Sequence, residues 1–421
     1  MYDQIANRTH PAGTKGAQVT AQSSKSSNHN FRADSAEALT KWVETTMGVL
    51  LVSRGSVQFA DDHDHWRKGI CRLLEIDEPK ARKLIENTVD AAERLFGRNL
   101  CNLPDEEKIT CLLQAVNDTF YKGKRKPFEA SLNVDLCGVS GPEGESADKI
   151  FAHSISGNQE YMVIGSEIDE FAWLVDAKTN QAVTADSIIY NEQYYAPQGN
   201  RHCGMKEYTR QLEWRLEKAR RIIDQVVAHA GARAEKWLSN PSQVKMLDIG
   251  SGIGYFRQAA QALGFHHNGI DLSQEIIKHC RETFGFETWH GRVEDLAKHA
   301  PGQKFQLITM FDVIEHLEKP RAVITLLKEF LSDDGILVIR TPNLAAQEAE
   351  ILGDYYYSFK LDHVRYFSAG SLTEMMHGVK MKSVYKETSS HLFKGVLGAD
   401  YLYKLGQAGR GADILALFEH A

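Results

Sequence analysis

The chain contains the segment Met246-Leu247-Asp248-Ile249-Gly250-Ser251-Gly252-Ile253-Gly254 and, further along, the segment Gly269-Ile270-Asp271-Leu272-Ser273. Val244 to Ile249 is a short apolar run, which is typical of a buried parallel strand. The three glycines that follow have no Cβ, so a ligand and a helix can both approach the backbone closely. The pattern predicts a strand, a glycine-rich turn and a helix, with a ligand above the turn.

The residues after the turn predict a second strand that ends on an acid. Residues 256–263 have helical character and stop at Gly264, and His267 to Ile270 begins the next strand. Doubly wound sheets bind ligands at the carboxyl ends of their strands, so we expect Asp271 at the ligand site. Asp248 would repel a pyrophosphate but suits a ligand with an amino group and a sulfonium. The charge pattern therefore favours S-adenosylmethionine over a dinucleotide.

Three more motifs follow in a fixed order. They are Phe311-Asp312-Val313-Ile314-Glu315-His316-Leu317-Glu318-Lys319-Pro320, Gly335-Ile336-Leu337-Val338-Ile339-Arg340-Thr341-Pro342-Asn343 and Asp362-His363-Val364-Arg365-Tyr366-Phe367-Ser368. With these motifs, residues 194 to 371 resemble the class I S-adenosylmethionine-dependent methyltransferases, within them the large bacterial-type family with a D-V-I-E-H-L…P motif. The resemblance implies an α/β fold with a doubly wound, mainly parallel, seven-stranded Rossmann-like sheet.

The resemblance also implies a site for S-adenosyl-L-methionine, with S-adenosyl-L-homocysteine as product and no metal. Its cofactor-binding residues would be Asp248, Gly250, Gly252, Gly254, Asp271, Leu272, Val293, Glu294, Asp295, Phe311 and Tyr195. Asp248 would approach the methionine end, and Asp271 would accept hydrogen bonds from both ribose hydroxyls. The family usually has an acid where this chain has Arg292, which leaves the adenine contact open between Glu294 and Asp295.

Candidate catalytic residues come from the segments after the fourth and fifth strands: His363, His316 and Tyr366. His363 is the first choice as a base, with Asp362 as the carboxylate that orients it. The alternative is that His363 anchors its loop by bonding a backbone carbonyl. For His316 and Glu315, a structural role, capping the turn that ends at Pro320, is favoured over catalysis.

An aromatic insertion and one arginine are the candidate acceptor site, namely Tyr194, Tyr355, Tyr356, Tyr357 and Arg365. Aromatic rings suit a ring, a sugar face or a lipid-like chain. Tyr194 and Tyr195 have the alternative of simply packing against the edge of the sheet.

The composition fits a cytoplasmic enzyme of two or three domains. The chain has 421 residues and a net charge of −7, which disfavours nucleic acid as a partner. No apolar run approaches the roughly 20 residues that cross a bilayer, and no secretory pattern begins the chain. The six cysteines are scattered, which indicates neither a disulfide framework nor a zinc knuckle.

We predict five segments along the chain. These are a disordered polar arm (1–34), a helical domain (35–126), a small β-rich segment (127–197), the methyltransferase domain (198–390) and a C-terminal helical tail (391–421). Relatives of this family often carry a zinc ribbon in the place of 127–197. Here Cys137 resembles part of its first knuckle, but Val134 stands where the partner cysteine would be, so the segment is interpreted as a degenerate ribbon without metal. A homodimer would form through the helical domain or the tail.

Three functions are compatible with these features. The leading one is O-methylation of a small molecule, such as a sugar, a polyketide or another secondary metabolite. The second is methylation of a protein, carrier-bound or RNA substrate that the helical domain 35–126 recognises. The third is a non-catalytic binding module, which the intact glycine-rich turn and Asp271 disfavour.

Overall fold

A computed structural model of the chain describes residues 77, 79–80, 83, 136, 139–156, 159–184, 212–352, 356, 358–390 and 399–421. The predicted polar arm lies outside these residues, as does all but a few positions of the predicted helical domain. None of the described helices is long and apolar enough to cross a membrane.

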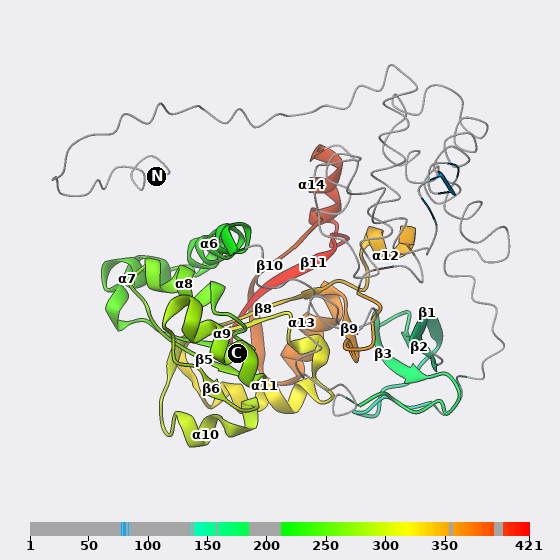
Figure 1. Ribbon diagram of the computed structural model, residues 1–421, viewed down its shortest axis with the longest axis horizontal. Helices are drawn as coiled ribbons and strands as arrows, with labels where there is room; N and C mark the ends of the chain where they lie inside the picture. The colour runs from blue at the N-terminus through cyan, green and yellow to red at the C-terminus, as the bar shows by residue number, and fades with distance from the viewer. Residues whose placement is uncertain are drawn as a thin grey trace, which may run out of the picture. The chain divides into compact units, whose positions relative to one another are not determined.

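Seven strands form the central sheet, in the order β10-β11-β8-β7-β4-β5-β6 (Figure 1). Their bounds are β4 Lys245–Ile249, β5 His266–Asp271, β6 Trp289–His290, β7 Phe305–Phe311, β8 Leu331–Pro342, β10 Met381–Ser389 and β11 Asp413–His420. The neighbours from β8 to β6 pair in parallel, whereas β11 is antiparallel to both β8 and β10. The prediction of a mainly parallel, seven-stranded sheet is confirmed.

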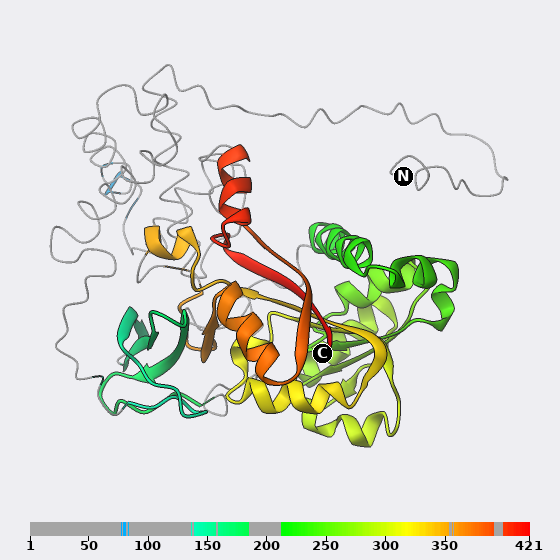
Figure 2. The same cartoon turned by 180° about the vertical axis from the view of Figure 1, so that it is seen from behind.

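Helices cover both faces of this sheet (Figures 1 and 2). They are α6 Leu212–His229, α7 Arg233–Ser239, α8 Tyr255–Ala262, α9 Gln274–Phe284, α10 Leu296–His299, α11 Pro320–Lys328, α12 Gln347–Leu352, α13 Ala369–Gly378 and α14 Ala399–Gln407, with short 3₁₀ turns η5 Pro241–Gln243, η6 Val293–Asp295 and η7 Ile314–His316. Successive residues of a strand point to opposite faces. Met246 accordingly packs with α6 and α8, while Leu247 and Ile249 pack with α11 and α13.

The prediction of a helical tail at 391–421 is wrong for its last part. Residues 399–407 form α14, but Asp413–His420 form strand β11 between β8 and β10. Residues 414–418 are all buried, as expected of a strand covered on both faces. The α/β domain therefore extends past residue 390, and β10 is not its final strand.

A second, four-stranded antiparallel sheet has the order β1-β2-β3-β9. Its strands are β1 Lys149–Ser156, β2 Gln159–Ser166, β3 Phe171–Asp176 and β9 Arg365–Phe367. Strands β1, β2 and β3 lie within the segment 127–197, for which the sequence predicts a β-rich character. Strand β9 belongs to the segment just after His363, so the β-rich segment pairs directly with the methyltransferase domain. Cys137 lies outside the described residues, and the degenerate ribbon stays a prediction.

Candidate cofactor and catalytic site

The glycine-rich turn between β4 and α8 has a backbone that only glycine adopts without strain. Gly250, Gly252 and Gly254 have φ angles of 64°, 53° and 95°. A Cβ on Gly250 would lie 2.5 Å from Val313 Cγ2, so the turn after β7 packs directly on the glycine-rich turn. Gly254 is the N-cap of α8 and has no side chain to cap it. The turn thus leaves the start of a helix open toward a ligand.

Asp248 is a buried carboxyl group at the end of β4, with an exposed fraction of 2%. Its Oδ1 accepts a hydrogen bond of 2.6 Å from Thr309 Oγ1, and its Oδ2 has no hydrogen-bond partner among the described residues. Burial raises the pKa of Asp248 to about 7. A carboxyl group in this state favours a cationic ligand, because a positive charge nearby would compensate the cost of ionising it.

Asp271 ends β5 and is held in one orientation by the backbone. Its two carboxylate oxygens accept hydrogen bonds of 2.9 Å from the N–H groups of Gly252 and Ser273. Burial raises the pKa of Asp271, and these bonds oppose that shift. A carboxylate oxygen accepts more than one hydrogen bond, so Asp271 can also accept from two ribose hydroxyls. The neighbouring Leu272 is 40% exposed, as a side chain that lies against an adenine would be before the ligand binds.

The residues expected near the adenine differ in their freedom to bind it. Val293 is buried and Glu294 is exposed, whereas Asp295 accepts a bond of 3.0 Å from the Arg292 N–H and contacts Lys298 Nζ at 2.5 Å. Of the two acids, Asp295 is thus held by neighbouring groups, whereas the Glu294 side chain is exposed to solvent. Phe311 is the last residue of β7, and its ring packs against that of Phe256 at a tilt of 32°, with ring centroids 3.9 Å apart.

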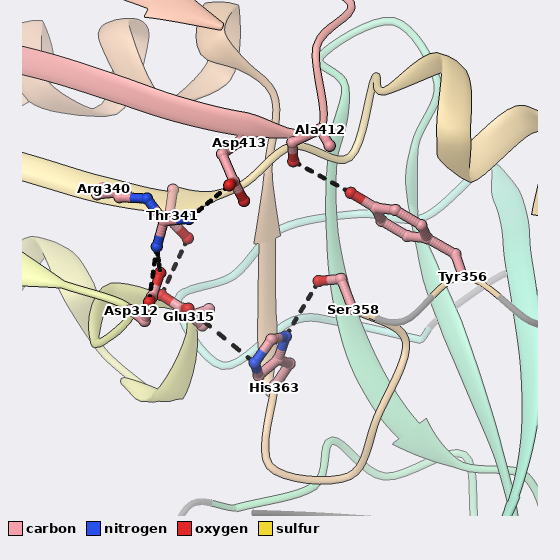
Figure 3. Close-up of polar contacts among 9 residues, drawn as sticks. All are labelled: Asp312, Glu315, Arg340, Thr341, Tyr356, Ser358, His363, Ala412 and Asp413. Carbon is pink, nitrogen blue, oxygen red and sulfur yellow. Dashed lines mark hydrogen bonds and ion pairs between the residues drawn. The ribbon is translucent and has the colours of Figure 1, made fainter. Parts of the chain in front are cut away.

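Glu315, His316 and His363 form one cluster at the exit of β7, and Figure 3 shows Glu315 and His363 facing each other. Glu315 Oε2 accepts a bond of 2.9 Å from Thr341 Oγ1, and its Oε1 lies 4.0 Å from His363 Nε2. The two imidazole rings meet edge to face, with centroids 4.9 Å apart. The structure therefore brings together His363 and His316, which the sequence offered as candidates from separate motifs.

Burial shifts the pKa of each member of the cluster toward its neutral form. It raises the pKa of Glu315 to about 8, and the nearby Asp312 carboxylate adds to the rise. It lowers the pKa of His316, and it lowers the pKa of His363 well below the usual value. Groups with shifts of this kind are common at functional sites.

Two predictions about this cluster are wrong. The partner of His363 Nδ1 is Ser358 Oγ at 3.1 Å, in place of the expected Asp362 carboxylate. Glu315 does not cap a helix: α11 starts at Pro320, and its N-cap Lys319 has no side-chain cap. Sequence reasoning therefore missed Glu315 as a functional candidate. Its position a few residues past a strand and beside His316 was the available signal.

A buried ionic network next to the cluster was also missed. Arg340 on β8 contacts both oxygens of Asp312 at 2.5 and 2.7 Å, and it pairs with Asp413 on β11 (Figure 3). Asp312 has a φ of 55°, which is uncommon for a residue other than glycine. The guanidinium thus holds the turn after β7 to the middle of the sheet.

Three further site candidates, Arg365, Tyr366 and Tyr356, are buried and form hydrogen bonds within the protein. Arg365 is fully buried, donates to the Glu318 carbonyl and contacts Glu145 Oε1 at 3.2 Å, so its predicted acceptor contact is wrong. Tyr366 is buried and donates to the Lys360 carbonyl at 3.3 Å, and its pKa is raised well above the usual value. Tyr356 donates to the carbonyls of Asn343 and Ala412, each at 3.2 Å, instead of lining an acceptor pocket. Because its pKa is raised in this way, Tyr366 does not act as an acid or a base near neutral pH.

The remaining aromatic candidates lie outside the described residues. They are Tyr194, Tyr195, Tyr355 and Tyr357. Their predicted contacts to cofactor or acceptor stay predictions.

Comparison with known proteins assigns the α/β domain. Residues 204–380 match the family model described as "Methyltransferase domain". The "Ubiquinone biosynthesis O-methyltransferase" of Glaesserella parasuis serovar 5 (strain SH0165) is 33% identical over 113 residues, covering 24% of this chain and 47% of the relative. The protein of that name from Xanthomonas campestris pv. campestris (strain B100) is 32% identical over 104 residues, covering 24% and 43%. The chain thus spans less than half the length of these curated relatives.

Among solved structures, the "SAM dependent methyltransferase from Archaeoglobus fulgidus" is 14% identical, with a TM-score of 0.35 over 50% of this chain and 99% of that one. This overall similarity adds no weight to the assignment. The family match and the aligned relatives support the assignment, and the order of the strands agrees with it. This chain contains a class I S-adenosylmethionine-dependent methyltransferase domain, to which the matched residues 204–380 belong.

Proposed function

We propose that this chain transfers the methyl group of S-adenosylmethionine to a hydroxyl oxygen of a small molecule. The observation that carries the proposal is the buried Asp248, whose Oδ2 has no hydrogen-bond partner among the described residues, beside a glycine-rich turn. A cofactor with a sulfonium and an ammonium supplies the positive charge that this carboxyl group favours. The names of the curated relatives support oxygen as the accepting atom.

Methyl transfer from a sulfonium is an in-line displacement. The protein has to align the attacking oxygen, the methyl carbon and the leaving sulfur, and this alignment supplies much of the rate acceleration. Asp271 would hold the ribose and Asp248 would lie at the methionine end. Because Val313 packs on Gly250, the turn after β7, which carries Glu315 and His316, touches the glycine-rich turn, and His363 joins these two residues from the loop before β9.

The acceptor hydroxyl must also lose its proton. The cluster after β7 offers a carboxyl group and two imidazoles for this purpose, within 4.8 Å of one another. A base with a pKa near the working pH is the most effective, and burial brings the pKa of Glu315 to about 8. We infer that this cluster manages the acceptor's proton. A macromolecular acceptor would involve the predicted helical domain 35–126, of which the structure describes only residues 77, 79–80 and 83.

Calorimetric titration of the full chain with S-adenosylmethionine and S-adenosylhomocysteine tests the cofactor site. We expect one site, and its loss in Asp271→Ala. Asp224→Ala, on the exposed face of α6, is the matched control and should bind as the unmodified chain does. Undiminished binding in Asp271→Ala, or no binding by the unmodified chain, would overturn the proposal.

The acceptor is tested with a panel of hydroxylated small molecules and isotopically labelled cofactor. The panel should contain sugars, hydroxylated aromatic rings and intermediates of ubiquinone biosynthesis, the process for which the relatives are named. We expect label in an ether linkage of the product. Label found only on nitrogen or carbon would contradict transfer to oxygen.

A further inference from the structure

The three side chains of the cluster also have the composition of a metal site. Each of Glu315, His316 and His363 offers one ligand atom, and these atoms all lie within 4.8 Å of one another. We propose that this cluster binds a divalent transition-metal ion, such as Zn²⁺ or Mn²⁺, through two imidazole nitrogens and one carboxylate oxygen. The remaining coordination position would be open to the acceptor.

The distances suit a metal of this kind after small side-chain rotations. A tetrahedral ion with bonds of about 2.1 Å holds its ligand atoms roughly 3.4 Å apart. Glu315 Oε1 and His363 Nε2 are 4.0 Å apart, so a closure of about 0.6 Å is sufficient for this pair. Two atoms at this spacing are too far apart for a hydrogen bond and close enough to share an ion.

Each ligand is already oriented by a second group. The Nδ1 of His316 contacts the Asp362 carbonyl, and because a carbonyl can only accept, Nδ1 carries the hydrogen and the lone pair of the neutral ring is on Nε2. Ligand histidines in metalloproteins characteristically bond a carbonyl in this way. The other two ligands are also hydrogen-bonded to oxygen groups. Ser358 Oγ lies 3.1 Å from His363 Nδ1, and Thr341 Oγ1 donates to Glu315 Oε2 at 2.9 Å.

One ligand atom of each of the three side chains lies within 4.8 Å of the other two. Glu315 Oε1 is buried and has no hydrogen-bond partner among the described residues, which is costly unless something else compensates it. The backbone also joins the two segments that supply the ligands, since the Val364 N–H donates to the Glu315 carbonyl at 2.9 Å. This backbone bond holds the two segments next to each other.

The donor set selects a class of metal. The two imidazoles suit Zn²⁺, Fe²⁺ or Ni²⁺ and the carboxylate also suits Mn²⁺, whereas Ca²⁺ and Mg²⁺ prefer oxygen ligands only. Zinc bound by two histidines and one glutamate with an open position is typical of catalytic sites, and structural zinc sites have four protein ligands. The three-residue cluster fits the catalytic pattern.

The role of the ion rests on the proposed function. A bound divalent ion would hold the acceptor's hydroxyl oxygen and lower its pKa, so that the proton leaves to solvent. The oxygen then forms a bond to the methyl carbon, the bond from that carbon to sulfur breaks, and sulfur keeps the electron pair. His363 and Glu315 would thus act as ligands in the loaded protein.

The site is tested by binding, with no need for the acceptor. The full chain is stripped with a chelator and titrated with ZnCl₂ and, separately, MnCl₂ by calorimetry and equilibrium dialysis. We expect one tight equivalent, and a loss of affinity of at least tenfold in His363→Ala and in His316→Ala. The chain has 17 histidines, so His377→Ala, on the exposed side of α13, is the control for surface binding and should retain full affinity.

Two outcomes would overturn the site: absence of a tight equivalent, or equal affinity in the three histidine variants. Circular dichroism and thermal melts identify variants that fail to fold, and Ser358→Ala, which leaves all three ligands in place, is then expected to weaken binding by a smaller factor. Cofactor titration of the same samples reports on the proposed function separately. A chain that binds the ion but not S-adenosylmethionine would retain the site and lose only its assigned role.

Discussion

Replacing Asp248 by Asn removes an ionisable group from the interior with little change of shape. Asp248 is 2% exposed, and burial raises its pKa from 3.8 to about 7. Its carboxyl group should therefore oppose folding at neutral and alkaline pH, where it ionises in the unfolded chain and at a cost in the folded one. Asn keeps an oxygen that can accept the bond from Thr309 Oγ1.

The magnitude follows from proton linkage. A raised pKa in the folded state contributes stability that is fully present below pH 3.8 and is lost as the pH rises through about 7. A difference of about 3 pH units corresponds to about 4 kcal/mol, at roughly 1.4 kcal/mol per unit. Asp248→Asn should thus match the cofactor-free chain in stability near pH 4 and exceed it by up to about 4 kcal/mol near pH 8.

Urea unfolding of both chains without cofactor, at intervals from pH 4 to pH 8, measures this difference directly. Other groups also change stability with pH, so the informative quantity is the difference between the two chains at each pH. Asp224→Asn on the exposed face of α6 serves as the control and should show no such trend. A difference that stays constant over this range would refute the reasoning.

Further predictions follow from the same region. In the unmodified chain, the affinity for S-adenosylmethionine should rise as the pH passes about 7, because ionised Asp248 attracts the sulfonium; calorimetry should find this rise absent in Asp248→Asn. Gly250→Ala should lower the free energy of unfolding by about 1–3 kcal/mol, measured in urea, because its φ is 64° and the new Cβ would lie 2.5 Å from a valine methyl. Arg340→Met should cost about 3–5 kcal/mol in the same assay by leaving Asp413 buried without its cation, and adding Asp413→Asn should recover part of the loss. Deletion of residues 413–421 should abolish cooperative unfolding seen by circular dichroism, because it removes β11 from between β8 and β10.

The cofactor half of the fold could be predicted because its signals are local. The apolar run before Gly250, the glycines and the acid at Asp271 each act within a few residues, and the structure has β4, α8 and β5 where these signals indicate. Strand β11 could not be predicted in this way. Its pairing with β8 joins residues far apart in sequence, so no local signal marks residues 413–420 as a strand of this sheet.

The cluster of Glu315, His316 and His363 was predicted only in part, because it too depends on contacts between residues far apart in sequence. His316 and His363 were both recognised, yet their proximity to Glu315 depends on the turn after β7 and the loop before β9 meeting in space. Arg365 illustrates the limit of residue type as evidence. An arginine beside the candidate catalytic residues suggested a contact to the acceptor, but its guanidinium is fully buried against the Glu318 carbonyl and Glu145.

The position of Arg365 also gives the β-rich segment a role at the site. Strand β3 pairs with β9, the Leu174 N–H donates to the Val364 carbonyl, and Arg365 reaches Glu145 in the segment before β1. The loop that carries His363 leads directly into β9, so the small sheet holds one side of the cluster while β7 and β8 hold the other. The candidate site is assembled from the turn after β7, strand β8 and the loop before β9. Such a site needs a support, because sub-ångström placement of the reacting groups governs the rate. We therefore interpret the sheet of β1, β2 and β3 as a support for the candidate site, joined to it by backbone pairing with β9, and not as an independent module.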